Sequence, residues 1–188
     1  MIKIIAGRLK GRVIPTEKGA NYRPTTSKVR EAMFSILSSG EFDASSFLQN
    51  AVMLDLYAGT GSISFEAISR GVIHSTLVDI DDGSLQKAKE FAEKIGEASS
   101  ISIFKCSATC LPKAYKKYNF VVMDPPYKKL YPAKTLQCLV QNNWLESGAI
   151  IAIETSLQEE ITLPTNMELV MIKKYGNSKL SIIRYVES

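Results

Sequence analysis

The 188-residue sequence predicts an α/β fold organised around a mostly parallel β-sheet. Short apolar segments alternate along the chain with segments of helical periodicity, and this alternation is typical of parallel sheets. One apolar strand, at residues 52–56, is followed by a glycine-containing turn and an amphipathic helix. Two further strand-like segments flank the turn residues 175–178, which predicts an antiparallel hairpin at the C-terminal end of the sheet.

The N-terminal elements precede this central strand. Short strands at residues 2–6 and 11–14 predict a small β-hairpin that carries its arginines outward. Pro24, followed by hydroxyl residues that can cap a helix, precedes apolar residues at helical spacing, so we expect a helix that ends near residue 38. Residues 41–50 are polar and turn-like and predict a connector.

The turn after the central strand has the pattern D-x-x-x-G-x-G, formed by Asp55, Gly59 and Gly61. Glycines let the backbone take positive φ and approach a ligand that meets the free N–H groups of the helix start. Ser64 stands where a dinucleotide fingerprint has its third glycine, so the turn fits S-adenosylmethionine (SAM) better, with Asp55 able to reach its methionine amino group. The alternative is an ordinary structural joint between strand and helix.

A second strand, at residues 75–80, carries Asp79 near its end. An acid at this place accepts hydrogen bonds from ribose hydroxyls in nucleotide-binding folds, and the alternative is a helix cap. Asp81 or Asp82 is the better candidate to cap the helix at residues 84–95. The remaining strands are expected at 101–105, 118–123, 149–154, 168–174 and 179–186, with helices at 111–115 and 134–141.

Composition predicts one main domain at residues 41–188 with an N-terminal extension at 1–40. With 45% hydrophobic residues the chain can bury a core, and it has no linker-like segment. No apolar stretch approaches the roughly 20 residues of a membrane span, and the first residues lack a secretory apolar segment, so we expect a cytoplasmic protein. Cysteines 106, 110 and 138 lack the spacing of a zinc site or a disulfide framework, and we expect no metal.

The charge of the chain is unevenly distributed. Residues 1–30 contain eight basic residues and one acidic residue, whereas the whole chain has a net charge of +4. A basic segment beside a near-neutral core indicates a nucleic-acid contact surface, because phosphate neutralisation supplies most sequence-independent affinity. The alternative is a solvated face. The candidate RNA contacts are Arg8, Lys10, Arg12, Lys28 and Arg30.

The sequence Asp124-Pro125-Pro126-Tyr127 follows the strand at residues 118–123. Two prolines fix φ and lack N–H donors, so the loop is rigid and its carbonyl groups remain available as acceptors. Asp124 and the Pro125 carbonyl can accept the two hydrogens of an exocyclic amine and aim its lone pair at a methyl group, while Tyr127 stacks on the base. The alternative is a rigid turn between strand and helix.

These motifs together resemble the N-methyltransferases with an Asp/Asn-Pro-Pro-aromatic signature, and in particular the bacterial RsmD-type 16S rRNA guanine-N2 methyltransferases. The resemblance spans nearly the whole chain. It depends on the segments IKIIAGRLKGRVIP, YRPTTSKVREAMFSIL, LDLYAGTGSISFEAISRG, LVDID, VVMDPPY, NNWLESGAIIAIETS and GNSKLSIIRY.

The resemblance implies a Rossmann-like SAM-dependent methyltransferase fold with a seven-stranded sheet. It also implies that Pro24 and its neighbours close over the cofactor. One departure is Ser107-Ala108, which stands where related enzymes often place Asp or Asn to bind the adenine amino group. The implied cofactor-binding residues are Arg23, Thr25, Thr26, Asp55, Tyr57, Gly59, Gly61, Asp79, Ile80, Ser107 and Ala108.

The function that follows is SAM-dependent methylation of the exocyclic N2 amine of a guanine in 16S rRNA. The expected catalytic residues are Asp124, Pro125, Pro126 and Tyr127, and the expected partner is 16S rRNA, free or within the small ribosomal subunit or its assembly intermediate. We expect a monomer. One alternative is a DNA adenine or cytosine amino methyltransferase, and another is a non-catalytic RNA-binding module that retains the fold.

Overall fold

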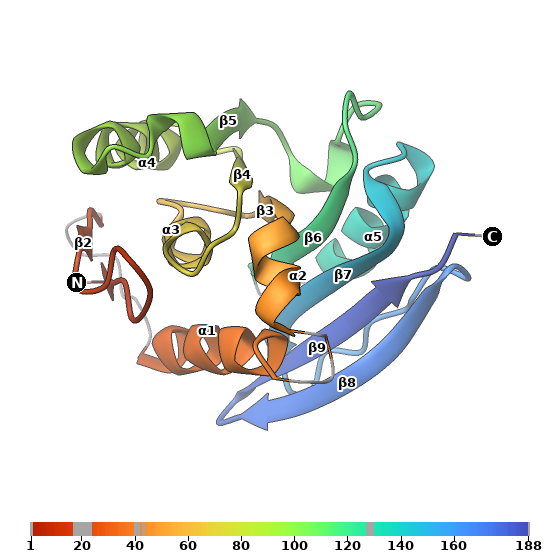
Figure 1. Ribbon diagram of the computed structural model, residues 1–188. Coiled ribbons are helices and arrows are strands. Elements are labelled where there is room, and N and C mark those ends of the chain that lie inside the picture. Colours follow the sequence, from red (N-terminus) through yellow and green to blue (C-terminus); the bar gives the residue numbers. More distant parts are fainter. Residues whose placement is uncertain (1, 17–23, 40–41, 43, 127–129, 188) are drawn as a thin grey trace.

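A seven-stranded β-sheet crosses the centre of the protein in the computed structural model (Figure 1). The structure describes residues 2–16, 24–39, 42, 44–126 and 130–187, and of residues 24–26 and 44–45 the backbone alone. The strands are β3 (Val52–Leu56), β4 (His74–Asp79), β5 (Ile101–Lys105), β6 (Tyr118–Met123), β7 (Leu145–Ser156), β8 (Met167–Tyr175) and β9 (Ser178–Tyr185).

The strand order is β5-β4-β3-β6-β7-β9-β8. β5, β4, β3, β6 and β7 are parallel, whereas β9 is antiparallel to both β7 and β8. The predicted mostly parallel sheet with a closing antiparallel pair is therefore confirmed. After β5 the chain crosses to the other side of β3, so the carboxyl ends of β3 and β6 lie next to each other at a topological switch point, where open α/β sheets bind ligands.

Helices cover both faces of the sheet. On one face lie α1 (Pro24–Leu37), α2 (Ala44–Asn50), α3 (Ser62–Ser69) and α4 (Asp82–Ile95), and on the other lies α5 (Tyr131–Gln141) (Figure 1). Alternate residues of each strand face opposite layers, so Met53 packs against α1 and α2, while Leu54 packs on the side of α5. None of the helices among the described residues is long and apolar enough to cross a membrane.

The N-terminal segment forms a short antiparallel pair, β1 (Ile2–Lys3) and β2 (Val13–Ile14), beside α3 and α4 (Figure 1). Ile2, Ile4, Leu9 and Ile14 share a buried cluster with residues of these two helices. The strands are shorter than the predicted 2–6 and 11–14. The reason is that the N–H groups of Ile5 and Ala6 donate to the carboxylate of Glu66 on α3 instead of to a neighbouring strand.

Two further expectations are wrong. The predicted connector at residues 41–50 contains α2, whose Leu48 is buried and whose Phe47 ring meets Phe120 of β6 edge to face. Residues 111–115 form no helix. There the carbonyl oxygen of Leu111 accepts a hydrogen bond from Asn142 Nδ2 and that of Pro112 accepts one from Trp144 Nε1, so side chains replace the backbone donors of a helix.

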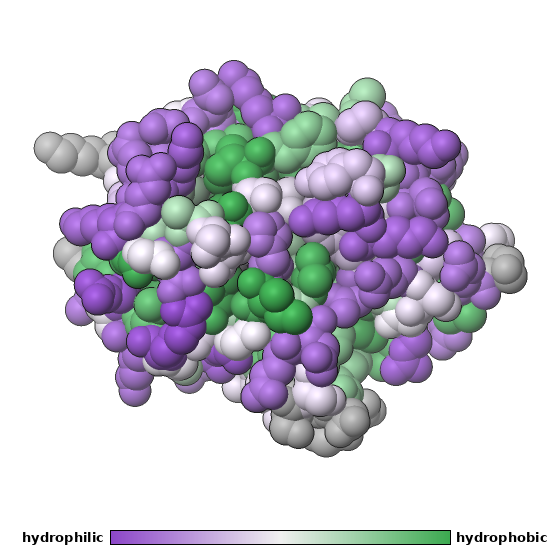
Figure 2. Space-filling view, turned by 45° about the horizontal axis from the view of Figure 1, so that its top comes forward, coloured by the Kyte–Doolittle hydropathy of each residue, from purple (hydrophilic) through white to green (hydrophobic). Residues whose placement is uncertain are grey.

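Other boundaries shift by a few residues. The fifth predicted strand, 149–154, is the central part of the longer β7, and the helix expected from residue 134 begins at Tyr131. On the face drawn in Figure 2, hydrophilic residues predominate and apolar residues gather in a few small groups. The described part of that face therefore has no single large apolar patch.

Candidate functional site

A cavity of about 210 Å³ opens at the carboxyl ends of the parallel strands. Five of the predicted cofactor-binding residues and one predicted catalytic residue, Pro126, line this cavity together. Its lining consists of Tyr57, Val78, Asp79, Ile80, Cys106, Ser107, Ala108, Thr109, Pro126 and Tyr131. Segments far apart in the sequence thus meet at the edge of the sheet that the motifs predict.

The glycine turn between β3 and α3 has the geometry that its sequence predicts. Tyr57, Gly59 and Gly61 all have positive φ, of 63°, 53° and 76°. At Gly61 a Cβ atom would lie 2.5 Å from Cδ2 of Leu77, so no larger residue fits without a shift of that side chain. Gly61 is also the N-cap residue of α3. Neither Gly59 nor Gly61 is among the residues that line the cavity.

Asp55 lies beneath this turn and is only 1% exposed. Its Oδ2 accepts hydrogen bonds from the backbone N–H of Ser64, at 3.2 Å, and from the Ser64 hydroxyl, at 2.6 Å. Burial raises the pKa of Asp55 to about 7, with smaller contributions from the charges of Asp124 and Asp79. Asp55 thus fastens the first turn of α3 to β3, and it is not among the residues that line the cavity.

Asp79 lines the cavity from the end of β4. Its Oδ2 accepts from the backbone N–H of Gly59 at 2.8 Å, and its Oδ1 accepts from the N–H of Asp81 at 2.9 Å. Each carboxylate oxygen has a second lone pair, so a fixed Asp79 can still accept from a ligand hydroxyl. The N-cap residue of α4 is Asp81, whose side chain accepts a hydrogen bond from the N–H of Gly83. Asp81 is one of the two residues that were predicted to cap this helix.

Two tyrosines form a wall of the cavity on the side of α5. The Tyr57 hydroxyl lies 2.7 Å from Oγ1 of Thr135, and its ring stacks on Tyr131 with 6.3 Å between centroids. Burial raises the pKa of the Tyr57 hydroxyl, which keeps it protonated. Tyr131 is a lining residue that the sequence reasoning missed, because the helix was expected to begin later. Pro132, a proline in the first turn, could have indicated the true start.

The loop after β5 forms another part of the lining. Ser107 and Ala108 line the cavity as predicted, and the Ser107 hydroxyl lies 3.0 Å from Oγ1 of Thr109. Cys106 and Thr109 were missed, although both flank the predicted pair at the carboxyl end of a strand. Burial raises the pKa of the Cys106 thiol, so this cysteine has no feature of an activated nucleophile.

The residues of the Asp-Pro-Pro loop follow β6 directly. Asp124 is half-buried, Pro125 is buried and Pro126 is exposed at the cavity. Arg23 and Tyr127 lie outside the described residues, whereas Thr25 and Thr26 belong to the first turn of α1. No cluster of three or more His, Cys, Asp or Glu side chains that could hold a metal ion occurs within the described ranges.

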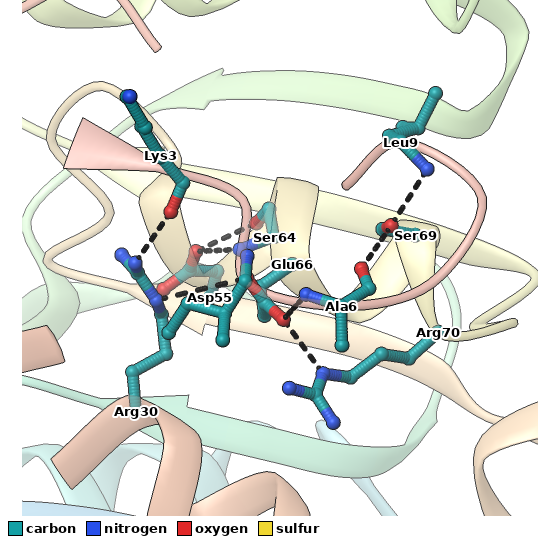
Figure 3. Close-up of polar contacts among 10 residues, drawn as sticks. Lys3, Ala6, Leu9, Arg30, Asp55, Ser64, Glu66, Ser69 and Arg70 are labelled. Atoms are coloured by element: carbon teal, nitrogen blue, oxygen red, sulfur yellow. Dashed lines mark hydrogen bonds and ion pairs between the residues drawn. The ribbon is translucent and has the colours of Figure 1, made fainter. Parts of the chain in front are cut away.

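A buried ion-pair network holds the N-terminal hairpin to the core (Figure 3). The carboxylate of Glu66, which is fully buried, accepts from the backbone of Ile5 and Ala6 and from Nε of Arg70 at 2.7 Å. Arg30 donates to the Lys3 carbonyl oxygen at 2.9 Å and lies 3.9 Å from Glu66. Arg30, predicted from the sequence to contact RNA, is only 3% exposed, so its burial opposes a contact with a phosphate.

The other predicted RNA contacts are exposed. Lys10, Arg12 and Lys28 lie at the surface. Arg8 is also exposed, but its guanidinium forms a two-pronged ion pair with Glu97, in which Nη2 donates to Oε2 at 2.8 Å. This pairing lowers the pKa of Glu97 and raises that of Arg8. Part of the charge of Arg8 is therefore committed to the fold.

Comparison with known proteins agrees with this geometry. The family model described as Conserved hypothetical protein 95 matches residues 2–184. The chain is 35% identical to an uncharacterized methylase of Rickettsia prowazekii, with 98% of both proteins covered. It is 32% identical to the ribosomal RNA small subunit methyltransferase D of Escherichia coli strain K12, covering 93% of this chain and 85% of that protein. The solved structure of the Escherichia coli protein yhhF superposes with a TM-score of 0.85 at 28% identity, covering 100% of this chain and 99% of that one.

Proposed function

Because the chain belongs to the family described as Conserved hypothetical protein 95, the RsmD-type methyltransferases, we propose that it methylates the exocyclic N2 amine of a guanine in 16S rRNA. The chain is a methyltransferase with the Rossmann-like fold of this class, and SAM is its cofactor. What we propose is that the methylated base is guanine, that the methylated atom is its N2 and that the substrate is 16S rRNA. One observation carries it: Pro126 of the Asp-Pro-Pro loop lines the same cavity as Asp79 and the loop after β5.

The residues of the cavity suit the parts of SAM. Asp79, already oriented by two backbone donors, would accept hydrogen bonds from the ribose hydroxyls. The Ile80 side chain, 71% exposed beside the cavity, would cover an apolar ring face, and Ser107 with Ala108 would meet the adenine edge. When bound, SAM supplies an electrophilic methyl group on a sulfonium, and the neutral thioether that leaves is a good leaving group.

The protein's part in the reaction is to position the amine. A guanine amino nitrogen is conjugated with its ring and is a poor nucleophile. Hydrogen bonds from its two hydrogens to Asp124 and to the Pro125 carbonyl would favour the geometry in which the nitrogen lone pair can attack. The proton released after transfer can pass to Asp124 or to solvent. Tyr127 is our candidate for stacking on the base.

The proposal that the substrate is rRNA depends on the relatives and on charge. Escherichia coli ribosomal RNA small subunit methyltransferase D is a relative over most of this chain. The exposed Lys10, Arg12 and Lys28 supply cations that can bind a phosphate backbone. Two outcomes of the test would compete with this proposal: methylation of an amino group in DNA, and binding of RNA without methyl transfer.

The test is methyl transfer from labelled SAM to small-subunit rRNA, as free RNA and as particles from cells that lack the modification. We expect transfer to RNA and none to DNA. Asp124→Ala should lower kcat by about 10²-fold while changing KM for SAM little, the signature of a lost transition-state contact. Asp82→Ala, which removes an exposed acid of α4, is the matched control and should stay active. A fully active Asp124→Ala enzyme would refute the role of the loop.

A further inference from the structure

Two acidic residues stand side by side at the carboxyl edge of the sheet. β6 and β7 are parallel neighbours in which Met123 pairs with Ile153, and Asp124 and Glu154 are the residues that follow this pair. Adjacent strands lie about 5 Å apart, so the two residues occupy corresponding positions on neighbouring strands. Glu154 has no place in the cofactor motifs, and Asp124 is the proposed amine-binding residue.

Both acids face the layer of α1. Val122 and Ala152, two residues earlier on each strand, are buried in the cluster that contains Val29 of α1, and the period of two places Asp124 and Glu154 on that same side. The two acids also line one small hollow with the buried Arg30 and with apolar side chains of α1 and α3. Glu154 is half-buried, and this hollow is separate from the larger cavity, which neither acid lines.

The chemistry of guanine matches such a pair. The Watson–Crick edge of guanine presents N1–H beside the two hydrogens of the N2 amine, whereas adenine presents an N1 lone pair beside its amine. Ionised carboxylates only accept hydrogen bonds. Building on the proposed function, we infer that Glu154 accepts the N1–H of the target guanine while Asp124 holds its N2 amine. Glu154 is then a specificity determinant, because its charge would oppose the N1 lone pair of adenine.

The test compares guanine with 2-aminopurine at the target position of a ligated rRNA. 2-Aminopurine keeps the exocyclic N2 amine but has a lone pair on N1 in place of the hydrogen. The wild-type enzyme should prefer guanine by about 10- to 100-fold in kcat/KM, the effect of one hydrogen bond to a charged group. Glu154→Gln should reduce the preference for guanine, because its amide can donate to N1 of 2-aminopurine as well as accept the N1–H of guanine.

Three controls separate the outcomes. Glu146→Gln makes the same change at the exposed opposite end of β7 and should keep the wild-type preference. Glu154→Asp keeps the charge on a side chain that is shorter by one methylene. This variant should therefore lose activity on guanine without gaining activity on 2-aminopurine. Thermal unfolding checks that each variant is folded, and SAM affinity should stay unchanged.

The proposed function and the inference fail in different ways. If the wild-type enzyme places no methyl on guanine N2, the proposed function is wrong and the inference falls with it. If the wild-type enzyme methylates guanine N2 but does not prefer it to 2-aminopurine, Glu154 does not read N1. The same conclusion follows if folded Glu154→Gln and Glu154→Asp both keep the wild-type preference.

Discussion

At the scale of single residues, Asp79 links the glycine turn to the loop that begins α4. Its two oxygens hold the N–H groups of Gly59 and Asp81, and the same carboxylate faces the cavity. This arrangement orients the acceptor before a ligand arrives, which reduces the entropy lost on binding.

We therefore expect Asp79→Ala to weaken SAM binding about tenfold or more, since a hydrogen bond to a charged group contributes about 1.5–3 kcal/mol. Calorimetry with S-adenosylhomocysteine and with an analogue lacking both ribose hydroxyls separates the ribose contact from damage to the turn. The loss of affinity should be large for S-adenosylhomocysteine and small for the analogue that lacks the ribose hydroxyls. Equal losses for both would show that Asp79 acts only by supporting Gly59.

Asp55 predicts a pH dependence of stability. Burial raises its pKa to about 7, so the folded state binds more protons than the unfolded state between about pH 4 and pH 7. The stabilising contribution of the protonated group is complete below about pH 4 and is lost as pH rises towards 7, at no more than about 1.4 kcal/mol per pH unit.

Urea unfolding of the wild-type protein and of Asp55→Asn between about pH 4 and pH 8 measures this effect. The free energy of unfolding of the wild type, relative to the variant, should fall with pH up to about 7 and then level off. The substitution removes the titrating group and keeps a carbonyl oxygen that can accept from the Ser64 hydroxyl. Parallel curves would contradict the raised pKa.

Site residues at the end of a strand or in the first residues after it could be predicted from the sequence. Asp79, Ser107, Ala108 and Pro126 stand at strand ends, and parallel strands bring those ends together. The role of Arg30 could not be predicted in this way. Its charge is compensated by Glu66, which lies on another helix, and only the packing of α1 against α3 reveals that pair.

At the scale of elements, the N-terminal hairpin is both packed and charged. Its apolar residues belong to the core cluster with α3 and α4, while Lys10 and Arg12 remain exposed. Arg8 is a poor probe of RNA binding, because removing it would also break the ion pair with Glu97.

Lys10→Ala combined with Arg12→Ala should therefore weaken RNA binding and leave SAM affinity unchanged. Each lost phosphate contact flattens the dependence of log K on log salt by just under one unit, so two contacts should flatten it by roughly 1.5 units. The control removes two exposed lysines of β8, Lys173 and Lys174, and should keep the parental slope. Equal slopes for all three proteins would show that the hairpin is a solvated face that does not contact RNA.

Elements with strong periodicity or glycine signals could be predicted, and those formed by tertiary contacts could not. The polar sequence of α2 conceals a helix that becomes stable when Phe47 and Leu48 pack on the sheet. Conversely, residues 111–117 stay irregular because Asn142 and Trp144, at the end of α5 and beyond, take the carbonyl groups of Leu111 and Pro112.

At the scale of the whole molecule, the alternation of strands and helices was sufficient to predict a parallel sheet with an antiparallel end. The strand order was not derivable from local patterns alone, because it depends on where the chain crosses β3 after β5. That crossing places the Asp-Pro-Pro loop beside the glycine turn, so the position of the site is a consequence of the topology.

We propose that this topology presents the N2 amine of a guanine in 16S rRNA to the methyl group of SAM. The most direct measurement is mass spectrometry of the nucleosides released from rRNA after reaction with labelled SAM. We expect the label to be recovered in N2-methylguanosine. Recovery of the label on a ring carbon, on a ribose hydroxyl or on adenine would contradict it.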